Sequence, residues 1–225
     1  MSRERLAVFA RAPRLGSVKT RLTPPLTQQQ ALVLHRALVE DTLERLTRLR
    51  RSSLERWLYL SEPLDPSHRL EVPRGWRSAL QEGDDLGARM ATVFHRAFQD
   101  DRERVVMVGS DSPTLPLDYL RQAFEALADH DVVLGPAEDG GYYLVGTSRS
   151  VPELFRDISW GSNRVLKQST KALAHGARTF QLLPVWYDID DHDDLLRLQR
   201  ELDELRTTRP SEIPRRTAAV LASLK

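Results

Sequence analysis

The sequence predicts an α/β fold in which helices cover a mostly parallel β-sheet. Short runs rich in valine and leucine alternate along the chain with longer segments whose leucines recur at helical spacing. Glycine, proline and aspartate follow most of the short runs, which is typical of the ends of buried strands. A chain of 225 residues can bury one sizeable core. We expect a single domain over residues 1–206 and an appended helix or tail over 207–225, because Thr207 to Pro210 break the last long helical pattern.

Strands are expected where an apolar run is too short for a helix and is bounded by turn residues. The first such run, Leu6 to Ala10, ends at Arg11-Ala-Pro13. The run from Val105 to Gly109 is rich in valine and precedes two prolines, which indicates a fully buried strand. In chain order, strands are expected at residues 6–10, 57–60, 78–81, 105–109, 131–135, 142–146 and 179–183.

Helices are expected where apolar residues recur every three or four positions. Thr27 and Gln30 have the spacing of a capping box, so a long helix is expected to begin there. Ser162 is expected to cap a helix that ends at Gly176. In chain order, helices are expected at residues 27–49, 86–97, 117–127, 162–176 and 195–205, with one amphipathic terminal helix after them.

The composition excludes several classes of protein. The 33 Lys and Arg nearly balance the 32 Asp and Glu, so the chain lacks the strong field typical of nucleic-acid or membrane-surface binders. The absence of cysteine excludes disulfides, cysteine-bound zinc, iron–sulfur clusters and thiol nucleophiles. No apolar run approaches the roughly 18 residues that a membrane span needs. We therefore expect a cytoplasmic protein with no nucleic-acid partner and no membrane span; its oligomeric state stays open.

Asp111 directly follows the expected strand at 105–109, within Gly109-Ser-Asp-Ser-Pro113. In open α/β sheets ligands bind at the carboxyl ends of the strands, because loops converge there and helix N-termini carry partial positive charge. A lone carboxylate in that place is a candidate metal or ribose ligand. The alternative is that Asp111 only opens a turn.

The loop after the first strand carries cations and no acid. It contains Arg11, Arg14, Lys19 and Arg21, with Gly16 in its middle. Phosphate binding needs free backbone N–H groups and charged donors, and such a loop between a strand and a helix supplies both. The spacing matches neither a Walker A loop nor Gly-x-Gly-x-x-Gly. A solvated basic loop is the alternative, and phosphate binding is favoured.

Gln81 to Gly87 form another expected strand-to-helix corner. A glutamine amide offers a donor and an acceptor, which suits the edge of a nucleobase. Gly83 and Gly87 would let a ring or a ribose approach the backbone. Glycines at a turn are, however, often only turn formers.

A second acidic loop, Glu138-Asp139-Gly140-Gly141, ends a further expected strand. Together with Asp111 it could share Mg²⁺ or Mn²⁺, which bind carboxylate oxygens and keep waters for substrate phosphates. Asp139 is also a candidate base, since it would need only to orient and deprotonate an acceptor hydroxyl. A plain turn is the alternative for Glu138 and Asp139.

The last acidic cluster precedes the helix at 195–205. Asp191, Asp193 and Asp194 are expected to cap that helix and stabilise its dipole. Asp188 and Asp190 lie just before the helix and could reach the metal instead.

Four motifs together resemble one family. They are Phe-Ala-Arg-Ala-Pro-Arg-Leu-Gly-Ser-Val-Lys-Thr-Arg-Leu at 9–22, Gln-x-Gly-x-Asp-Leu-Gly-x-Arg-Met at 81–90, Gly-Ser-Asp-Ser-Pro at 109–113, and Gly-Pro-Ala-Glu-Asp-Gly-Gly-Tyr-Tyr-Leu-Val-Gly at 135–146. Over residues 6–198 the chain resembles the bacterial DUF2064, or arsenosugar-biosynthesis-associated, glycosyltransferase family. Its members are similar to nucleotide-diphospho-sugar transferases of the GT-A fold and, more distantly, to the molybdenum-cofactor and phospholactate guanylyltransferases.

The resemblance implies a three-layer α/β/α sandwich with a mixed sheet. It also implies roles for individual residues: Arg11, Gly16, Lys19 and Arg21 at the nucleotide phosphates, Gln81 and Gly87 near the base, Asp111 as metal ligand, and Gly140 and Gly141 at the donor-sugar or acceptor pocket, with Glu138 and Asp139 beside them. In place of the usual Asp-x-Asp the chain has Ser110-Asp111-Ser112, which is also similar to the Gly-Asp-x-Pro of nucleotidyltransferases.

These observations favour a metal-dependent transferase that moves a sugar from a nucleotide-diphospho-sugar to a small-molecule acceptor. Lys19, Arg21 and the metal would stabilise the departing diphosphate, with Asp139 as base and Asp188 as a second metal ligand. The alternative is a nucleotidyltransferase that joins an NTP to a phosphorylated metabolite and releases pyrophosphate. A catalytically inert nucleotide-binding module is the third hypothesis.

Overall fold

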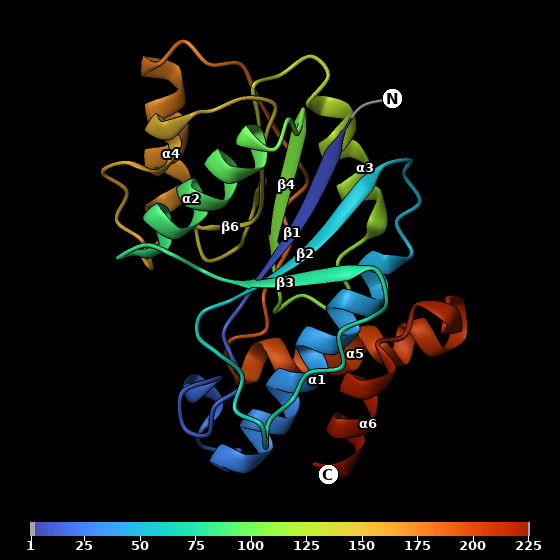
Figure 1. The fold of residues 1–225 in the computed structure, drawn as a ribbon. Coiled ribbons are helices and arrows are strands. Elements are labelled where there is room, and N and C mark those ends of the chain that lie inside the picture. The colour runs from blue at the N-terminus through green and yellow to red at the C-terminus, as the bar shows by residue number, and fades with distance from the viewer. Residues whose placement is uncertain (1–2, 225) are drawn as a thin grey trace.

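A seven-stranded mixed β-sheet forms the centre of the molecule (Figure 1). The computed structural model describes residues 3–224. The strand order is β3-β2-β1-β4-β6-β5-β7, and only β6 runs antiparallel to its neighbours among these strands. The strands are β1 (Glu4–Ala10), β2 (Leu54–Leu60), β3 (Trp76–Leu80), β4 (Arg104–Gly109), β5 (Val132–Pro136), β6 (Tyr142–Thr147) and β7 (Phe180–Leu182).

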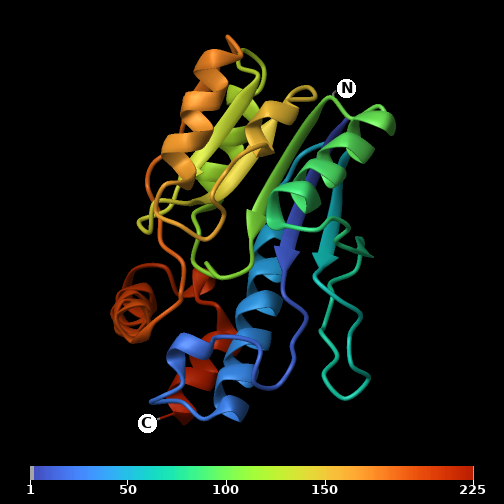
Figure 2. The same cartoon turned by 90° about the vertical axis from the view of Figure 1, so that its left-hand side faces the viewer.

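Helices cover both faces of this sheet (Figures 1 and 2). They are α1 (Gln28–Thr47), α2 (Leu86–Gln99), α3 (Leu117–Ala126), α4 (Val165–His175), α5 (His192–Thr208) and α6 (Arg215–Ser223), with short 3-10 helices at Thr20–Leu22, Pro152–Phe155 and Pro210–Glu212. Because side chains alternate along a strand, Leu6 and Val8 of β1 pack under α1 and α3, whereas Ala7 packs with α2 and α4 on the opposite face. The predicted three-layer α/β/α sandwich with a mostly parallel mixed sheet is confirmed.

Helices α5 and α6 bury a third apolar cluster against the far side of α1. Leu34 and Leu38 of α1 meet Leu198 and Leu202 of α5 there. Helix α6 is also held by charge: Arg216 pairs with acids of α1 and with Glu71. The tail expected over 207–225 therefore folds back onto α1 within the described residues, and its separation from the domain at residue 206 stays a prediction.

The strands β1 and β4 end side by side. Their parallel register pairs Phe9 with Gly109, so Arg11 and Asp111 leave the sheet at the same edge. In Figure 2 the arrows of β1 and β2 point toward the end of the molecule that holds the loop after β1 and helix α5. The cationic loop and the Asp111 loop are thus brought together by strand pairing alone.

Most expected elements occur at their expected places, and the capping box of Thr27 and Gln30 is present at the start of α1. The start of α4 differs. Its N-cap is Arg164, and Ser162 instead donates to the carbonyl of Ser159 and closes a tight turn. Among residues 3–224 no helix has the length and apolar character needed to cross a membrane.

Candidate functional site

The loop after β1 places Lys19 at the centre of the site. Lys19 adopts the left-handed backbone region, with φ at 49°, and its side chain is only 4% exposed. Its ammonium lies 3.0 Å from Asp111 Oδ1 and 3.2 Å from Asp190 Oδ1, and it donates to the carbonyl of Ile189. Burial opposes the charge of Lys19, but the two carboxylates outweigh it and raise the Lys19 pKa. Lys19 is therefore a fixed cation that joins three loops.

The arginines of the same loop are placed differently. Arg14 pairs with Glu62 at 2.8 Å. Arg11 donates to the carbonyl of Ser17, and neither Arg11 nor Arg21 forms an ion pair within residues 3–224. Both guanidinium side chains line the same cleft as Lys19. They are the cations of this loop that remain available to an anionic ligand.

Asp111 is held between Lys19 and a buried histidine. Burial opposes the charge of Asp111, but the nearby ammonium of Lys19 lowers its pKa. His35 of α1 has its Nε2 at 3.0 Å from the carbonyl of Arg11, and since a carbonyl accepts only from a donor, Nε2 carries the proton. The unpaired Nδ1 lies 4.0 Å from Asp111 Oδ1. Burial lowers the His35 pKa, which keeps this ring neutral beneath the carboxylate.

Asp188 approaches the site from the segment that precedes α5. Its Oδ1 accepts a hydrogen bond of 2.6 Å from the hydroxyl of Ser112, which directly follows Asp111 in the loop after β4. Burial, together with the charges of Asp111 and Asp190, raises the Asp188 pKa to about 6. The carboxylates therefore lie close enough to repel one another.

The loop after β5 contributes Asp139 but turns Glu138 away. Asp139 Oδ1 accepts from the N–H of Gly141 and its side chain lines the cleft beside Arg11 and Lys19. Glu138 instead pairs with Arg197 of α5 at 2.7 Å. Gly140, with φ at 87°, packs so closely on Asn163 that a Cβ would lie 2.3 Å from its carbonyl oxygen. These contacts place Asp139 alone of this loop's acids in the cleft.

The remaining predicted residues, Gln81, Gly87 and Gly16, are not among those that line the cleft of Lys19. Gln81 donates through Nε2 to the carbonyls of Ala10 and Tyr59, so its amide N–H groups face the strand ends. Gly87 packs on Trp160, since a Cβ there would lie 2.3 Å from the indole Nε1. Gly16 has φ at 75° and lies against the side chain of Gln28. The roles expected for these three at a nucleotide stay predictions.

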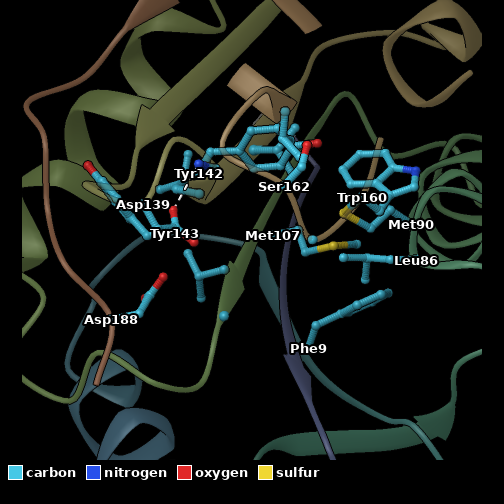
Figure 3. Close-up of a pocket in the computed structure, with 17 residues that line it drawn as sticks. Phe9, Leu86, Met90, Met107, Asp139, Tyr142, Tyr143, Trp160, Ser162 and Asp188 are labelled. Carbon is cyan, nitrogen blue, oxygen red and sulfur yellow. Dashed lines mark hydrogen bonds between the residues drawn. The ribbon is translucent and has the colours of Figure 1, made fainter. Parts of the chain in front are cut away.

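Three adjoining hollows connect these residues. The central cleft, about 360 Å³, contains Lys19 and Asp139, and a hollow of about 570 Å³ next to it reaches Gln81. The central cleft shares Asp139 and Gly161 with an apolar pocket of about 240 Å³ (Figure 3). A ligand can therefore extend across the carboxyl ends of β1 and β4 in both directions.

The carboxylates suit a divalent cation held partly by a ligand. Within residues 3–224 no group of three or more histidine and acidic side chains is arranged to hold a metal ion. Asp111 and Asp188 nevertheless repel each other, and the one cation in contact with Asp111 Oδ1 within the described residues is Lys19, at 3.0 Å. Mg²⁺ is usually held by one or two carboxylates, with waters and substrate phosphates completing its shell. The pair fits that mode.

Sequence reasoning did not select His35 or Ser112. His35 lies three residues after Leu32 and four before Val39, so it is a polar residue within the buried stripe of α1. That interruption is a usable signal for a buried polar contact. Ser112 had no such signal, because serines are common in loops after strands.

Comparisons with known proteins agree with this architecture. No curated protein matches the chain. A protein from Desulfovibrio desulfuricans G20, assigned as a nucleotide-diphospho-sugar transferase, is 31% identical with a TM-score of 0.83, over 99% of this chain and 98% of that one.

Two more distant structures share the fold. CMP:2-keto-3-deoxy-manno-octonic acid synthetase in complex with CTP is 11% identical, with a TM-score of 0.56 over 90% of this chain and 99% of that one. Rv0371c from Mycobacterium tuberculosis H37Rv, in complex with manganese, is 19% identical, with a TM-score of 0.54 over 88% and 98%.

The family described as "Uncharacterized protein conserved in bacteria (DUF2064)" matches residues 42–162, more than half of the chain. The association with arsenosugar biosynthesis stays a prediction. The family match and the full-length relative at 31% identity agree, and the protein belongs to the DUF2064 family.

Proposed function

We propose that this protein is a metal-dependent glycosyltransferase that takes a sugar from a nucleotide-diphospho-sugar and transfers it to a small-molecule acceptor. The observation that carries the proposal is the central cleft, where Arg11, Lys19 and Arg21 face Asp111 and Asp139 at the carboxyl ends of β1 and β4. The assignment of the Desulfovibrio relative, which aligns over its whole length, supports the same class of donor.

The cations of the β1 loop would bind the diphosphate. Arg11 and Arg21 are free of carboxylate partners within the described residues, and guanidinium groups suit phosphate oxygens because they donate two parallel hydrogen bonds. Lys19 would donate to the same diphosphate by exchanging one of its three present acceptors, which are Asp111, Asp190 and the carbonyl of Ile189, for a phosphate oxygen. Mg²⁺ or Mn²⁺ would be held by Asp111 and Asp188, and when bound it neutralises charge on the departing diphosphate.

The transfer itself needs a base and a stabilised leaving group. The acceptor hydroxyl oxygen attacks C1 of the sugar and forms the new C1–O bond, while the bond from C1 to the diphosphate oxygen breaks. The leaving nucleoside diphosphate keeps that electron pair, and Lys19 and Arg21 stabilise its charge. Asp139 takes the proton of the acceptor hydroxyl. It is suited to this because its side chain lies in the cleft and its Oδ1 is oriented by Gly141.

Nucleotidyl transfer is the second candidate. The end of β4 offers one acid, Asp111, between two serines, and such a site serves an NTP as well as a nucleotide-sugar. In that reaction the α-phosphorus would be attacked by a phosphorylated metabolite, and pyrophosphate would leave. Arg11, Lys19 and Arg21 would then hold the triphosphate.

One experiment separates these reactions. The protein is incubated with Mg²⁺ or Mn²⁺ and either a panel of nucleotide-sugars or a panel of NTPs with sugar 1-phosphates, and the products are identified. Release of nucleoside diphosphate from a nucleotide-sugar supports the proposal, and release of pyrophosphate contradicts it in favour of nucleotidyl transfer. Binding of nucleotide-sugars without turnover of any substrate would identify an inert binding module.

A further inference from the structure

We infer that the acceptor carries an aromatic ring, and that this ring enters the apolar pocket beside the central cleft. The pocket lies between α2 and the strands β4 and β6, and its apolar wall includes Phe9, Leu86, Met90, Met107, Tyr142 and Trp160. The inference rests on the proposed transferase function and names the class of acceptor, which that function leaves open.

The side chains of the apolar pocket suit an aromatic guest. The chain has three methionines, and the two internal ones, Met90 and Met107, both line this pocket. Methionine sulfur makes favourable contacts with aromatic rings, and its unbranched side chain adapts to ligand shape. Tyr142 and Trp160 are arranged edge to face, with ring centroids 6.2 Å apart and planes at 87°. They present an aromatic corner at which a further ring can stack or meet an edge.

The volume of the pocket fits one or two fused rings. It measures about 240 Å³. A cavity of about 150 Å³ lined by apolar side chains is sufficient to bind benzene. A phenol or an indole therefore fits, whereas a long lipid tail does not.

A sugar is a poor guest for this pocket. Each hydroxyl buried without a hydrogen-bond partner costs about 1–3 kcal/mol. Ser162 on the pocket wall already donates to the carbonyl of Ser159, and the hydroxyl oxygen of Tyr142 is fully buried, so neither side chain offers a free hydrogen-bonding group to a guest. The carboxylates of Asp139 and Asp188 lie on one side of the pocket, and the rest of its wall consists largely of carbon and sulfur, so the donor sugar is better placed in the polar central cleft.

The position of the pocket sets the orientation of the guest. Figure 3 shows Asp139 and Asp188 on one side of the pocket and Leu86, Met90 and Trp160 on the other. An aromatic ring seated among the apolar side chains would thus direct its hydroxyl group toward Asp139, the proposed base. The wall itself is fixed, because Trp160 packs on Gly87 where no Cβ would fit.

The two internal methionines provide a direct test. The protein is labelled with [methyl-¹³C]methionine and its methyl signals are assigned with Met90→Leu and Met107→Leu variants. Titration with p-cresol is expected to shift the Met90 and Met107 signals saturably, because the ring current of a bound aromatic group changes the chemical shifts of nearby methyl groups. Titration with myo-inositol, a polar ring with hydroxyl groups, is expected to leave both signals in place.

A matched pair of variants controls for fold. Leu86 in the pocket and Leu196 on α5 are both large apolar side chains, 44% and 43% exposed respectively, so neither is needed in a core. Leu86→Gln is expected to weaken p-cresol binding by about fivefold, since part of a leucine's apolar contact is lost. Leu196→Gln is expected to leave it unchanged. Unmoved methyl signals in the wild-type protein, or equal effects of the two variants, would overturn the inference.

A second measurement separates this inference from the proposed function. With a nucleotide-sugar that binds, release of nucleoside diphosphate is compared with p-cresol and with myo-inositol as acceptors. Faster release with p-cresol supports the inference, and faster release with myo-inositol overturns it while leaving glycosyl transfer intact. Saturable methyl shifts in a protein that binds no nucleotide would contradict the proposed function and the acceptor assignment, but not an aromatic-binding site.

Discussion

The ammonium of Lys19 lies 3.0 Å from Asp111 Oδ1 and joins the loop after β1 to the loop after β4. Both residues leave parallel strands at the same edge of the sheet, and Asp190 completes the contact from the segment before α5. The same ammonium is proposed to bind phosphate. Lys19 therefore pairs with Asp111 in the ligand-free protein and is proposed to bind the phosphate groups of the ligand in the complex.

Replacing Lys19 by methionine is expected to weaken nucleoside-diphosphate binding by about tenfold to a hundredfold, because a hydrogen bond to a charged group contributes about 1.5–3 kcal/mol. Thermal shift with UDP, GDP, ADP and CDP in Mg²⁺ identifies a nucleotide that binds, and calorimetry then compares the variant with the wild type. Lys167→Met removes an exposed lysine of α4 and is the control. Equal affinities of the two variants would show that Lys19 does not bind the phosphates.

Replacing Asp111 by alanine is expected to lower the free energy of unfolding by about 1–3 kcal/mol, since Lys19 stays buried with a weaker set of partners. The loss is less than that of a fully buried pair, because Asp111 is 34% exposed and water screens the interaction. Urea denaturation measures it.

The double variant Lys19→Met with Asp111→Ala gives the matching control. Removing both charges is expected to cost less than the two single variants added together, because neither Lys19 nor Asp111 is then left facing the place of a missing partner. Additive costs would contradict a direct ion pair. Loss of nucleotide binding in Asp111→Ala, with the stability known, can then be assigned to the ligand site instead of to unfolding.

The ends of the strands were predictable because they follow from local patterns. The valine-rich run before Asp111 and the apolar run before Arg11 identify buried strands, and parallel pairing must bring their carboxyl ends to one edge. Lys19 and Asp111 could therefore be placed near one another from sequence. The partner Asp190 is 171 residues from Lys19, and no local pattern reports such a contact.

Local sequence patterns do not report contacts between distant residues, and this also explains why some predicted site residues line the cleft and others do not. Glu138 and Asp139 are adjacent in sequence, yet Glu138 pairs with Arg197, which is 59 residues away, whereas Asp139 lines the cleft. The apolar pocket was not predictable either. Met90 continues the helical periodicity of α2 and Met107 lies in a buried strand, so both have the pattern of ordinary core residues.

Replacing Gly140 by alanine is expected to destabilise the protein by about 2–4 kcal/mol and to impair transfer, because the new Cβ both occupies a positive-φ position and collides with the backbone of Asn163. Gly75→Ala is the matched control: its φ of 91° is close to the 87° of Gly140, but nothing lies within 4 Å of its Cβ. Denaturation of both variants separates backbone strain from collision. Equal losses of stability would show that the contact with Asn163 is unimportant.

Replacing Asp188 by asparagine is expected to stabilise the metal-free protein at pH 8 and to have little effect at pH 4. Folding raises the Asp188 pKa from 3.8 to about 6, so the folded state binds the proton more tightly than the unfolded state does. Stability contributed by the protonated group is present below the unfolded pKa and is lost as the pH rises through the folded pKa. Asparagine keeps the acceptor for Ser112 without the charge that Asp111 and Asp190 repel.

Urea denaturation of the wild type and the Asp188→Asn variant, in EDTA at both pH values, measures this difference in stability. Mg²⁺ at pH 8 should make the wild type more stable than the variant, because only the wild type has both carboxylates to bind the ion. If Mg²⁺ raises the free energy of unfolding of the variant as much as that of the wild type, Asp188 is not a metal ligand.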